Sequence, residues 1–439
     1  MPGLRPGDLD RHTTPTLYEW ASAGVSAALR PTFPCVTSPV QASMWTGVPP
    51  GSHGVIANGF FDRERSAVAF WVAGHDVVEG EAVWDALHRI DAGLTSAVWH
   101  GQNIKGAGAD YLVTPAPIHK PDGTTELWCY SKPEDLYPRL LDALGHFPLQ
   151  HYWGPAANLE STRWILRGAL WLMREHGPRL NWIYVPHLDY AGQKSGPDSE
   201  EARAALMELD GALAAFRAEL DALGKDTAVL ITGEYAMTNV RGAVYPNRIL
   251  REAGWLSVRE EDAAEWLDLP NSRAFAMADH QFAHVYVREP RLVEAVAERF
   301  RAVPGIARVL AGGERKEAGL DHPRSGEVIL IADESRWLAY PWWFEDAAAP
   351  PFARTVDIHR KPGYDPLEMF LDPAGGGISL DTDLIRGSHG VPATGPHHHA
   401  ALICSVPTGA VEAGRVYADT DVKGIVLRLV QSGTEGRKR

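Results

Sequence analysis

A hydroxyl at the start of a short predicted helix is the first feature of this sequence that could do chemistry. Thr37 follows an extended, proline-bounded segment, and residues 41–45 continue as a helical stretch that ends at Gly47. Pro39 suits the first helical turn, where no amide hydrogen is needed. Free N–H groups and the positive end of the helix dipole favour a phosphate at such a position. Thr37 is therefore a candidate nucleophile for phosphoryl chemistry, and an ordinary N-cap is the alternative.

Three further polar residues follow segments that the sequence predicts as strands or turns. Asp189 follows the buried strand predicted at 180–185. Glu234 follows the strand predicted at 227–231, and His389 stands in a glycine-rich turn much later in the chain. A strand–helix–strand order predicts a parallel sheet, and sites in such sheets gather at the carboxyl ends of the strands. We therefore expect Asp189 and Glu234 to lie at this edge of the sheet. Taken singly, Asp189 is also explained as a cap at a helix start and His389 as a turn residue.

The segment around the threonine also carries a longer pattern. Residues 31–58 contain F-P-x-x-T-x-P, then T-G, then P-x-S-H-G-V and an asparagine, Asn58. This pattern resembles the nucleophile region of the nucleotide pyrophosphatase/phosphodiesterases, a family of the alkaline phosphatase superfamily. The resemblance implies that Thr37 attacks phosphorus and that Asn58 helps to hold a phosphate oxygen. It also implies an alkaline-phosphatase-like α/β fold, with a largely parallel central sheet flanked by helices and with inserted cap loops.

The resemblance further implies divalent metal ions. In that family a pair of cations activates the nucleophile and stabilises the entering and leaving oxygens. Asp189 and His389 match two of the family's metal ligands, whereas Gln193 stands where a histidine is expected. Glu234 and Tyr235 stand in place of a consecutive Asp–His pair. These five residues form a predicted site richer in oxygen donors than the family pattern, which favours Mg or Mn over Zn or leaves one position empty.

Other polar residues are weaker candidates. Contacts to substrate phosphate are predicted for three of them, His187, His359 and Lys361. Asp279 and His280 form another Asp–His pair, but the pair falls within a region predicted as strand and not after the expected one. The three histidines at 397–399 are expected to form a solvated loop, although they are capable of binding a metal adventitiously.

The chain is expected to form a single domain over residues 1–439, with cap or insert segments near 60–132 and 255–345. Long amphipathic helices are predicted at 160–176 and 199–223 from their apolar spacing. The resemblance also implies an N-terminal strand followed by a metal-binding aspartate, which this sequence does not show. Either the true start lies upstream of Met1, or the protein does without this strand and its ligand.

Composition sets the class of protein and its partners. Hydrophobic residues make up 45% and charged residues 22% of the 439 residues, as in ordinary globular proteins. The net charge of −14, without a concentrated basic stripe, argues against a nucleic-acid polymer as partner. Three widely spaced cysteines predict neither a disulfide framework nor a metal site, so we expect a cytoplasmic protein. No apolar run is long enough to span a membrane.

These features together predict a metal-assisted hydrolase of phosphodiester or pyrophosphate bonds in a small-molecule phosphate ester. The cofactors would be divalent ions, Zn, Mn or Mg, in a number that the sequence leaves open. Two alternatives remain. One is a catalytically silent or altered-metal homologue that binds a phosphorylated ligand, and the other is a phosphomonoesterase or phosphotransferase.

Overall fold

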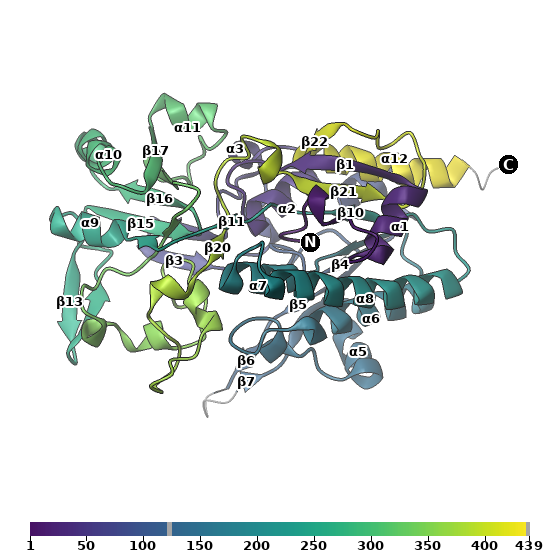
Figure 1. The fold of residues 1–439 in the computed structure, drawn as a ribbon, viewed down its shortest axis with the longest axis horizontal. Coiled ribbons are helices and arrows are strands. Elements are labelled where there is room, and N and C mark those ends of the chain that lie inside the picture. The colour runs from purple at the N-terminus through teal and green to yellow at the C-terminus, as the bar shows by residue number, and fades with distance from the viewer. Residues whose placement is uncertain (121–124, 436–439) are drawn as a thin grey trace.

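The fold is described for residues 1–120 and 125–435 of a computed structural model (Figure 1). One central sheet has the strand order β10–β21–β1–β22, made of β1 (Val25–Arg30), β10 (Leu230–Thr232), β21 (Ala400–Cys404) and β22 (Val416–Ala418). Strand β21 runs antiparallel to both β10 and β1, whereas β1 pairs in parallel with β22. Segments from both halves of the chain therefore build this sheet.

A second central sheet has the order β8–β5–β4–β9, made of β4 (Ser96–Trp99), β5 (Tyr111–Pro115), β8 (Cys129–Lys132) and β9 (Leu180–Ile183). Strand β4 is parallel to β5 and β9, and β8 is antiparallel to β5. The α/β class is confirmed. The pairing is more mixed than the predicted largely parallel sheet, because β21 and β8 run against their neighbours.

Residues of β9 and β10, one strand from each central sheet, line a common cavity of about 990 Å³. The chain around Met1 extends the β10 side of this region. The Met1 nitrogen donates to the Thr232 carbonyl at 2.9 Å, and the Met1 carbonyl accepts from the Glu234 amide at 3.1 Å. These two bonds fix the backbone of Glu234 just beyond the end of β10.

Helices cover both faces of the central sheets. On one face lie α1 (Pro15–Ala23), α6 (Leu159–Glu175) and α8 (Glu200–Ala222), whose apolar sides share a core with residues of β4 and β21. On the other lie α2 (Thr37–Thr46) and α12 (Val422–Glu435). Figure 1 shows α6 and α8 on one side of the central strands and α12 on the other. The two long helices predicted from apolar spacing are confirmed.

A third, antiparallel sheet lies at the opposite end of the molecule. Its order is β15–β16–β18–β17, with β15 (Ala274–Asp279), β16 (Phe282–Val287), β17 (Ile306–Ala311) and β18 (Val328–Ala332). Helices α9 (Pro246–Glu252) and α10 (Val293–Arg301) pack against it (Figure 1). This sheet falls within the predicted insert at 255–345. The other predicted insert, 60–132, supplies β4, β5 and β8 to a central sheet.

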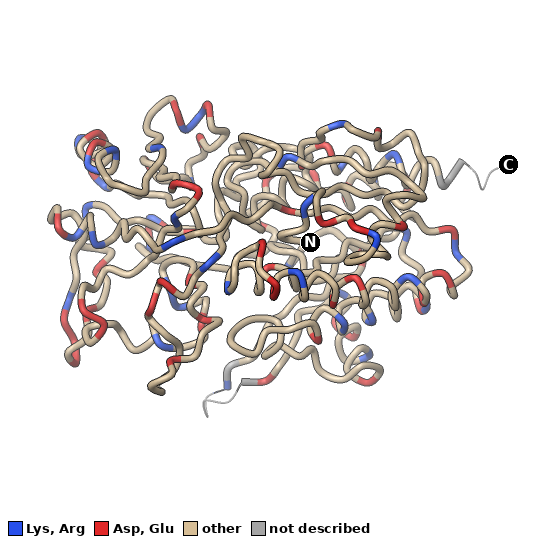
Figure 2. Tube along the Cα trace, viewed as in Figure 1, with Lys and Arg blue, Asp and Glu red and all other residues tan. Residues whose placement is uncertain are grey.

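Charged residues lie along the outer helices and loops, with acidic and basic side chains interspersed (Figure 2). The long helix α8 shows this mixture clearly, since Glu200, Glu201 and Arg203 stand in its first turns. Within the described part of the chain, no helix combines the length and the apolar character needed to cross a membrane.

Candidate active site

Thr37 is the first residue of α2, directly after the extended segment that follows β1. The cap position itself is held by Val36, whose backbone is extended at φ −129° and ψ 160°. Thr37 therefore stands one position inside the helix, not at the N-cap. Its side chain is buried at 4% exposure, and its Oγ1 lies 3.2 Å from the phenol oxygen of Tyr235. The hydroxyl thus faces a neighbouring segment of the chain and not open solvent.

A chain of hydrogen bonds extends from this hydroxyl. The Tyr235 phenol donates to Asp189 Oδ1 at 3.1 Å, and Gln193 Nε2 donates to Asp189 Oδ2 at 2.5 Å. The Tyr364 phenol in turn donates to Gln193 Oε1 at 2.8 Å. Asp189 and Gln193 stand one turn apart in α7 (His187–Ser195), which begins soon after β9. The carboxyl end of β9 thus delivers the carboxylate to the threonine, as the rule for strand ends predicts.

His389 follows the short strand β20 (Gly387–Ser388) and lies against the same group. Its Nδ1–H donates to the Cys35 carbonyl at 2.8 Å, so Nε2 carries the free lone pair. That Nε2 lies 3.8 Å from Asp189 Oδ1 and finds no hydrogen-bond partner among the described residues. The ring stacks on Tyr235, with centroids 3.6 Å apart and planes at 9°. Burial holds the pKa of His389 well below its ordinary value, so the ring is neutral.

Two buried carboxylates accompany this imidazole. Burial raises the pKa of Asp189 to about 7. Burial also raises the pKa of Glu234, against the nearby Met1 ammonium and a hydrogen bond from Gln41, which both lower it. Gln41 Nε2 donates to Glu234 Oε1 at 2.8 Å, while Glu234 Oε2 is buried without a partner in residues 1–120 and 125–435. The donor types suit a divalent cation, since a carboxylate oxygen and an imidazole nitrogen keep free lone pairs here. As placed, however, the ligand atoms of Asp189, Glu234 and His389 do not all lie within 4.8 Å of one another, so binding would need the Glu234 side chain to move.

Tyr235 and Gln193 differ from the other predicted ligands. Burial raises the pKa of Tyr235 well above its ordinary value, so the phenol keeps its proton and acts as a hydrogen-bond donor. Both ends of the Gln193 amide are engaged, the nitrogen with Asp189 and the oxygen with Tyr364. The two residues that depart from the family pattern thus join the carboxylate to its neighbours through hydrogen bonds.

Two residues of the group were not assigned from the sequence, His280 and Tyr364. His280 occupies the turn between β15 and β16 at φ +60°, where its ring stacks on Tyr364 with centroids 3.6 Å apart. The His280 ring also lies 3.9 Å from that of His389. The Asp-His-Gln sequence between two apolar runs was the available signal for a turn here. The contact with Tyr364 joins segments far apart in the chain, which no local pattern reveals.

Asn58 lies beside the start of α2. Its backbone N–H and its Nδ2 donate to the two carboxylate oxygens of Asp279, at 2.8 and 3.0 Å. Its Oδ1 accepts from the Ser38 amide at 2.9 Å. Asn58 therefore ties the first turn of α2 to the end of β15, next to the threonine hydroxyl.

The three predicted substrate contacts are engaged elsewhere. The Lys361 ammonium is buried and bonds to Thr355 O, Asp365 Oδ2 and Glu368 Oε1, each at 2.8 Å. All three of its N–H bonds are thereby used, which leaves none for a substrate. His187 Nε2 lies 3.2 Å from Glu208 Oε2, and His359 Nδ1 lies 3.0 Å from the Phe70 carbonyl. None of these partners belongs to the group around Thr37.

Known proteins resemble this chain in sequence and in fold. A protein described as an uncharacterized pyrophosphatase/phosphodiesterase of Schizosaccharomyces pombe is 25% identical over 217 residues, which are 48% of this chain and 37% of that protein. Phosphonoacetate hydrolase of Sinorhizobium meliloti, solved with phosphonoacetate, has a TM-score of 0.62 at 17% identity and covers 98% of this chain and 94% of its own. The chain thus spans little more than a third of its relative from Schizosaccharomyces pombe.

A second solved structure gives the same picture. Murine ectonucleotide pyrophosphatase/phosphodiesterase 5 has a TM-score of 0.61 at 15% identity and covers 98% of this chain and 93% of its own. At such identities the two structures establish the fold, and they confirm the alkaline-phosphatase-like architecture predicted from the sequence. The family model described as type I phosphodiesterase/nucleotide pyrophosphatase matches residues 1–365. The chain belongs to the type I phosphodiesterase/nucleotide pyrophosphatase family.

Proposed function

We propose that this protein is a metal-assisted hydrolase of phosphodiester or pyrophosphate bonds in small molecules, with Thr37 as its nucleophile. Family membership supports hydrolysis of phosphorus–oxygen bonds. The observation that carries the assignment is the position of the Thr37 hydroxyl. It stands at the first residue of a helix and within one buried group that includes Asp189, Glu234 and His389.

The hydrogen bonds supply a route for the proton of the nucleophile. Thr37 Oγ1 would attack phosphorus, forming a threonine–phosphorus bond while the bond to the leaving oxygen breaks. Its proton would pass to the Tyr235 oxygen, and the Tyr235 proton would pass to Asp189 Oδ1. When no cation occupies Asp189, a carboxylate with a pKa of about 7 suits this role at neutral pH. The amides at the start of α2 would bind the phosphoryl oxygens, and water would later release the phosphoryl group.

Asp189, Glu234 and His389 are the residues that would hold a divalent cation. When bound, such a cation supplies positive charge to the phosphoryl oxygens as a Lewis acid. Two carboxylates and one imidazole accept Mg, Mn or Zn, and the oxygen-rich set favours the harder ions. We assign Tyr235 and Gln193 to hydrogen bonding and not to coordination, because the phenol stays protonated and both ends of the amide are engaged. Asn58 would position the first turn of α2, where the phosphate would bind.

A second candidate is an altered-metal homologue that binds a phosphorylated ligand without turning it over. The buried hydrogen-bond network between Thr37 and Asp189 favours this candidate, because its groups are already bonded to one another. Thr37 and Asp189 are 4% and 8% exposed, and each hydroxyl or amide between them is already paired. A third candidate is a phosphomonoesterase or phosphotransferase. Its variant, a phosphonate hydrolase, is suggested by the similar solved structure that holds phosphonoacetate.

The test compares three variants on three substrates in Mg, Mn or Zn. Thr37→Ala is expected to abolish hydrolysis of bis(4-nitrophenyl) phosphate, and Thr37→Ser is expected to retain part of it. Thr46→Ala is the matched control, since Thr46 ends the same helix and bonds to Ala42 O at 2.6 Å. Hydrolysis of 4-nitrophenyl phosphate or phosphonoacetate in preference to the diester would move the assignment to the third candidate. Stoichiometric phosphate-ester binding without turnover would favour the second.

A further inference from the structure

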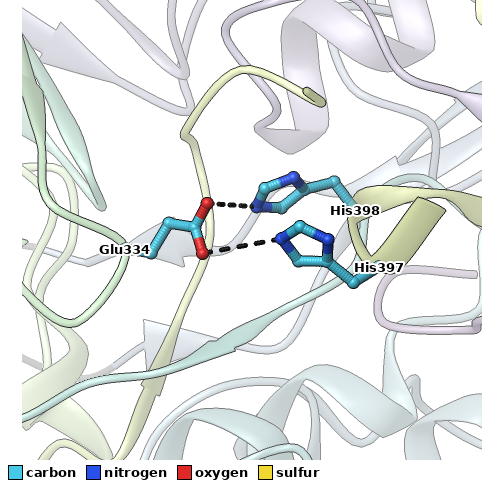
Figure 3. A group of neighbouring side chains, drawn as sticks. All are labelled: Glu334, His397 and His398. Carbon is cyan, nitrogen blue, oxygen red and sulfur yellow. Dashed lines mark ion pairs between the residues drawn. The ribbon is translucent and has the colours of Figure 1, made fainter. Parts of the chain in front are cut away.

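A second group of potential metal ligands lies outside the candidate active site. Glu334 follows β18. His397 and His398 belong to η9 (Pro396–His398), a 3₁₀ helix of one turn. One ligand atom of each residue lies within 4.8 Å of the others. Figure 3 shows the two rings pointing from η9 toward the carboxylate on the opposite segment.

The distances match those of a small coordination sphere. His398 Nε2 lies 3.1 Å from Glu334 Oε1, and His397 Nε2 lies 3.5 Å from Glu334 Oε2. Donor atoms bound to zinc at 2.0–2.2 Å in tetrahedral geometry are separated by about 3.3–3.5 Å. One cation between the rings and the carboxylate would therefore reach all three residues with small side-chain movements.

The ring of His398 is oriented as a ligand. Its Nδ1 lies 3.5 Å from the Thr394 hydroxyl, the second contact that metal-binding histidines usually make. Its Nε2 is buried and has no hydrogen bond of suitable geometry within the described residues, although the carboxylate is near. Two lone pairs facing each other at 3.1 Å repel unless a proton or a cation lies between them.

Neighbouring contacts hold the other two residues in place. A Cβ added at Gly395 would lie 3.1 Å from atoms of the His397 ring, so this ring rests directly on the Gly395 backbone. The Glu334 carbonyl accepts from Thr238 Oγ1 at 2.8 Å and from Gln281 Nε2 at 2.9 Å. The side chains of Glu334 and His397 are 52% and 61% exposed, so an ion has access from solvent.

We propose that Glu334, His397 and His398 form a zinc-binding site with a fourth position open to water. Two imidazoles and one carboxylate are a donor set that zinc accepts, and three protein ligands leave one position open. The site joins two parts of the fold, because β18 belongs to the antiparallel sheet and η9 leads into β21 of a central sheet. It is also close to the candidate active site, because Gln281 connects the two. The side-chain Nε2 of Gln281 donates to the Glu334 carbonyl, and the backbone N–H of Gln281 donates to the His389 carbonyl.

Zinc titration of untagged protein, stripped with a chelator, tests this site. Wild type is compared with His398→Ala, with Glu334→Gln and with His399→Ala, the adjacent histidine that lies outside the group. We expect the first two variants to bind one zinc fewer than wild type, or to bind that zinc at least about tenfold more weakly. His399→Ala is expected to bind as wild type does. If His398→Ala does not fold, the comparison of Glu334→Gln with wild type tests the site on its own.

A second readout separates this site from any cation held near Thr37. Added zinc is expected to raise the unfolding temperature of Asp189→Asn protein, and Glu334→Gln on that background is expected to remove the increase. Equal zinc stoichiometry and affinity in His398→Ala, Glu334→Gln and His399→Ala would overturn the proposal. Loss of all zinc binding in Asp189→Asn alone would overturn it as well, because it would assign the metal to the other group.

Discussion

The hydroxyl of Thr37 lies 3.2 Å from the phenol oxygen of Tyr235, although 198 positions separate the two residues in the chain. Strand β1 leads to the first, and strand β10 leads to the second. Through the same phenol the hydroxyl reaches Asp189. A buried threonine beside a carboxylate with a pKa of about 7 is the arrangement from which the proposed nucleophile derives its reactivity.

Tyr235→Phe removes the phenol oxygen and keeps the ring that stacks on His389. We expect the free energy of unfolding to fall by about 1–3 kcal/mol, because two buried groups lose a hydrogen-bond partner. We expect kcat to fall by about 100-fold or more, since the proton route is broken. The bond from Tyr235 lowers the pKa of Asp189, so the acidic limb of the pH–rate profile should move to higher pH.

A merely structural Tyr235 would give a different result. In that case the stability would fall, but the pH–rate profile of the remaining activity would keep its position. Unchanged kcat in folded Tyr235→Phe would contradict the proton route.

Cation binding near Thr37 is expected to depend on pH through Asp189. Its folded-state pKa of about 7 lies above the ordinary value of 3.8, so protons compete with the cation up to neutral pH. Affinity for Mn should be roughly tenfold weaker at about pH 6 than at about pH 8. Calorimetric titration at both pH values measures this, and pH-independent binding would exclude Asp189 as a ligand.

The same shift has a consequence for stability. A raised folded-state pKa means that the protonated carboxyl stabilises the fold at low pH and that this contribution is lost as pH rises through about 7. A bound cation offsets the loss. Excess Mn should therefore raise the unfolding temperature more at about pH 8 than at about pH 6. An equal or opposite difference would contradict this linkage.

Gly387 brings the histidine and carboxylate segments together. A Cβ at this position would lie 2.1 Å from the Gly192 carbonyl in α7, so Gly387→Ala must push β20 and α7 apart. We expect a loss of about 1–3 kcal/mol or more in the free energy of unfolding, and a lower kcat. Gly211→Ala is the control, because outside the adjoining backbone of its own helix no described heavy atom lies within 4 Å of the added Cβ. In the interior of α8 it should stabilise by about 0.5–1 kcal/mol.

Lys361 tests the difference between a structural and a substrate-binding cation. Lys361→Met leaves Asp365 and Glu368 buried without their shared partner, and we expect a loss of about 3–5 kcal/mol. The loss should be larger at about pH 8 than at about pH 5.5, because unpaired buried carboxyls become protonated at low pH. Arg360→Met, whose side chain is 63% exposed, should change stability by less than about 0.5 kcal/mol. A raised KM in a fully stable Lys361→Met protein would restore the substrate role.

Much of the fold could be predicted from local patterns. The apolar spacing in 160–176 and 199–223 gave two long helices, and short apolar runs before Asp189 and Glu234 gave strands that end near the site. The strand pairing was harder to predict, because β21 lies between β1 and β10 in the sheet. Along the chain, β21 begins 370 positions after the end of β1 and 168 positions after the end of β10. Hydrophobic periodicity marks a strand and does not mark its neighbours.

The candidate active site also contains residues that local patterns predict and residues that only long-range contacts reveal. Thr37 and Asp189 were named from their place before a helix and after a strand. His280 was considered as part of an Asp–His pair and set aside, and Tyr364 was not considered, because their contacts with the group arise from the hairpin of an antiparallel sheet and from a loop far along the chain. Lys361 was predicted to bind substrate because its loop is rich in charge. Charge alone does not reveal that Asp365 and Glu368 accept two of its three N–H bonds and that the Thr355 carbonyl accepts the third.

The nucleophile is tested most directly by capturing its intermediate. Wild-type protein and Thr37→Ala are mixed with bis(4-nitrophenyl) phosphate in Mn, quenched in acid within a single turnover and analysed by peptide mass spectrometry. The account predicts a 4-nitrophenyl phosphoryl group on Thr37 of wild type, formed as one equivalent of nitrophenol is released, and no adduct in Thr37→Ala. An adduct on another residue, or wild-type turnover by Thr37→Ala, would contradict it.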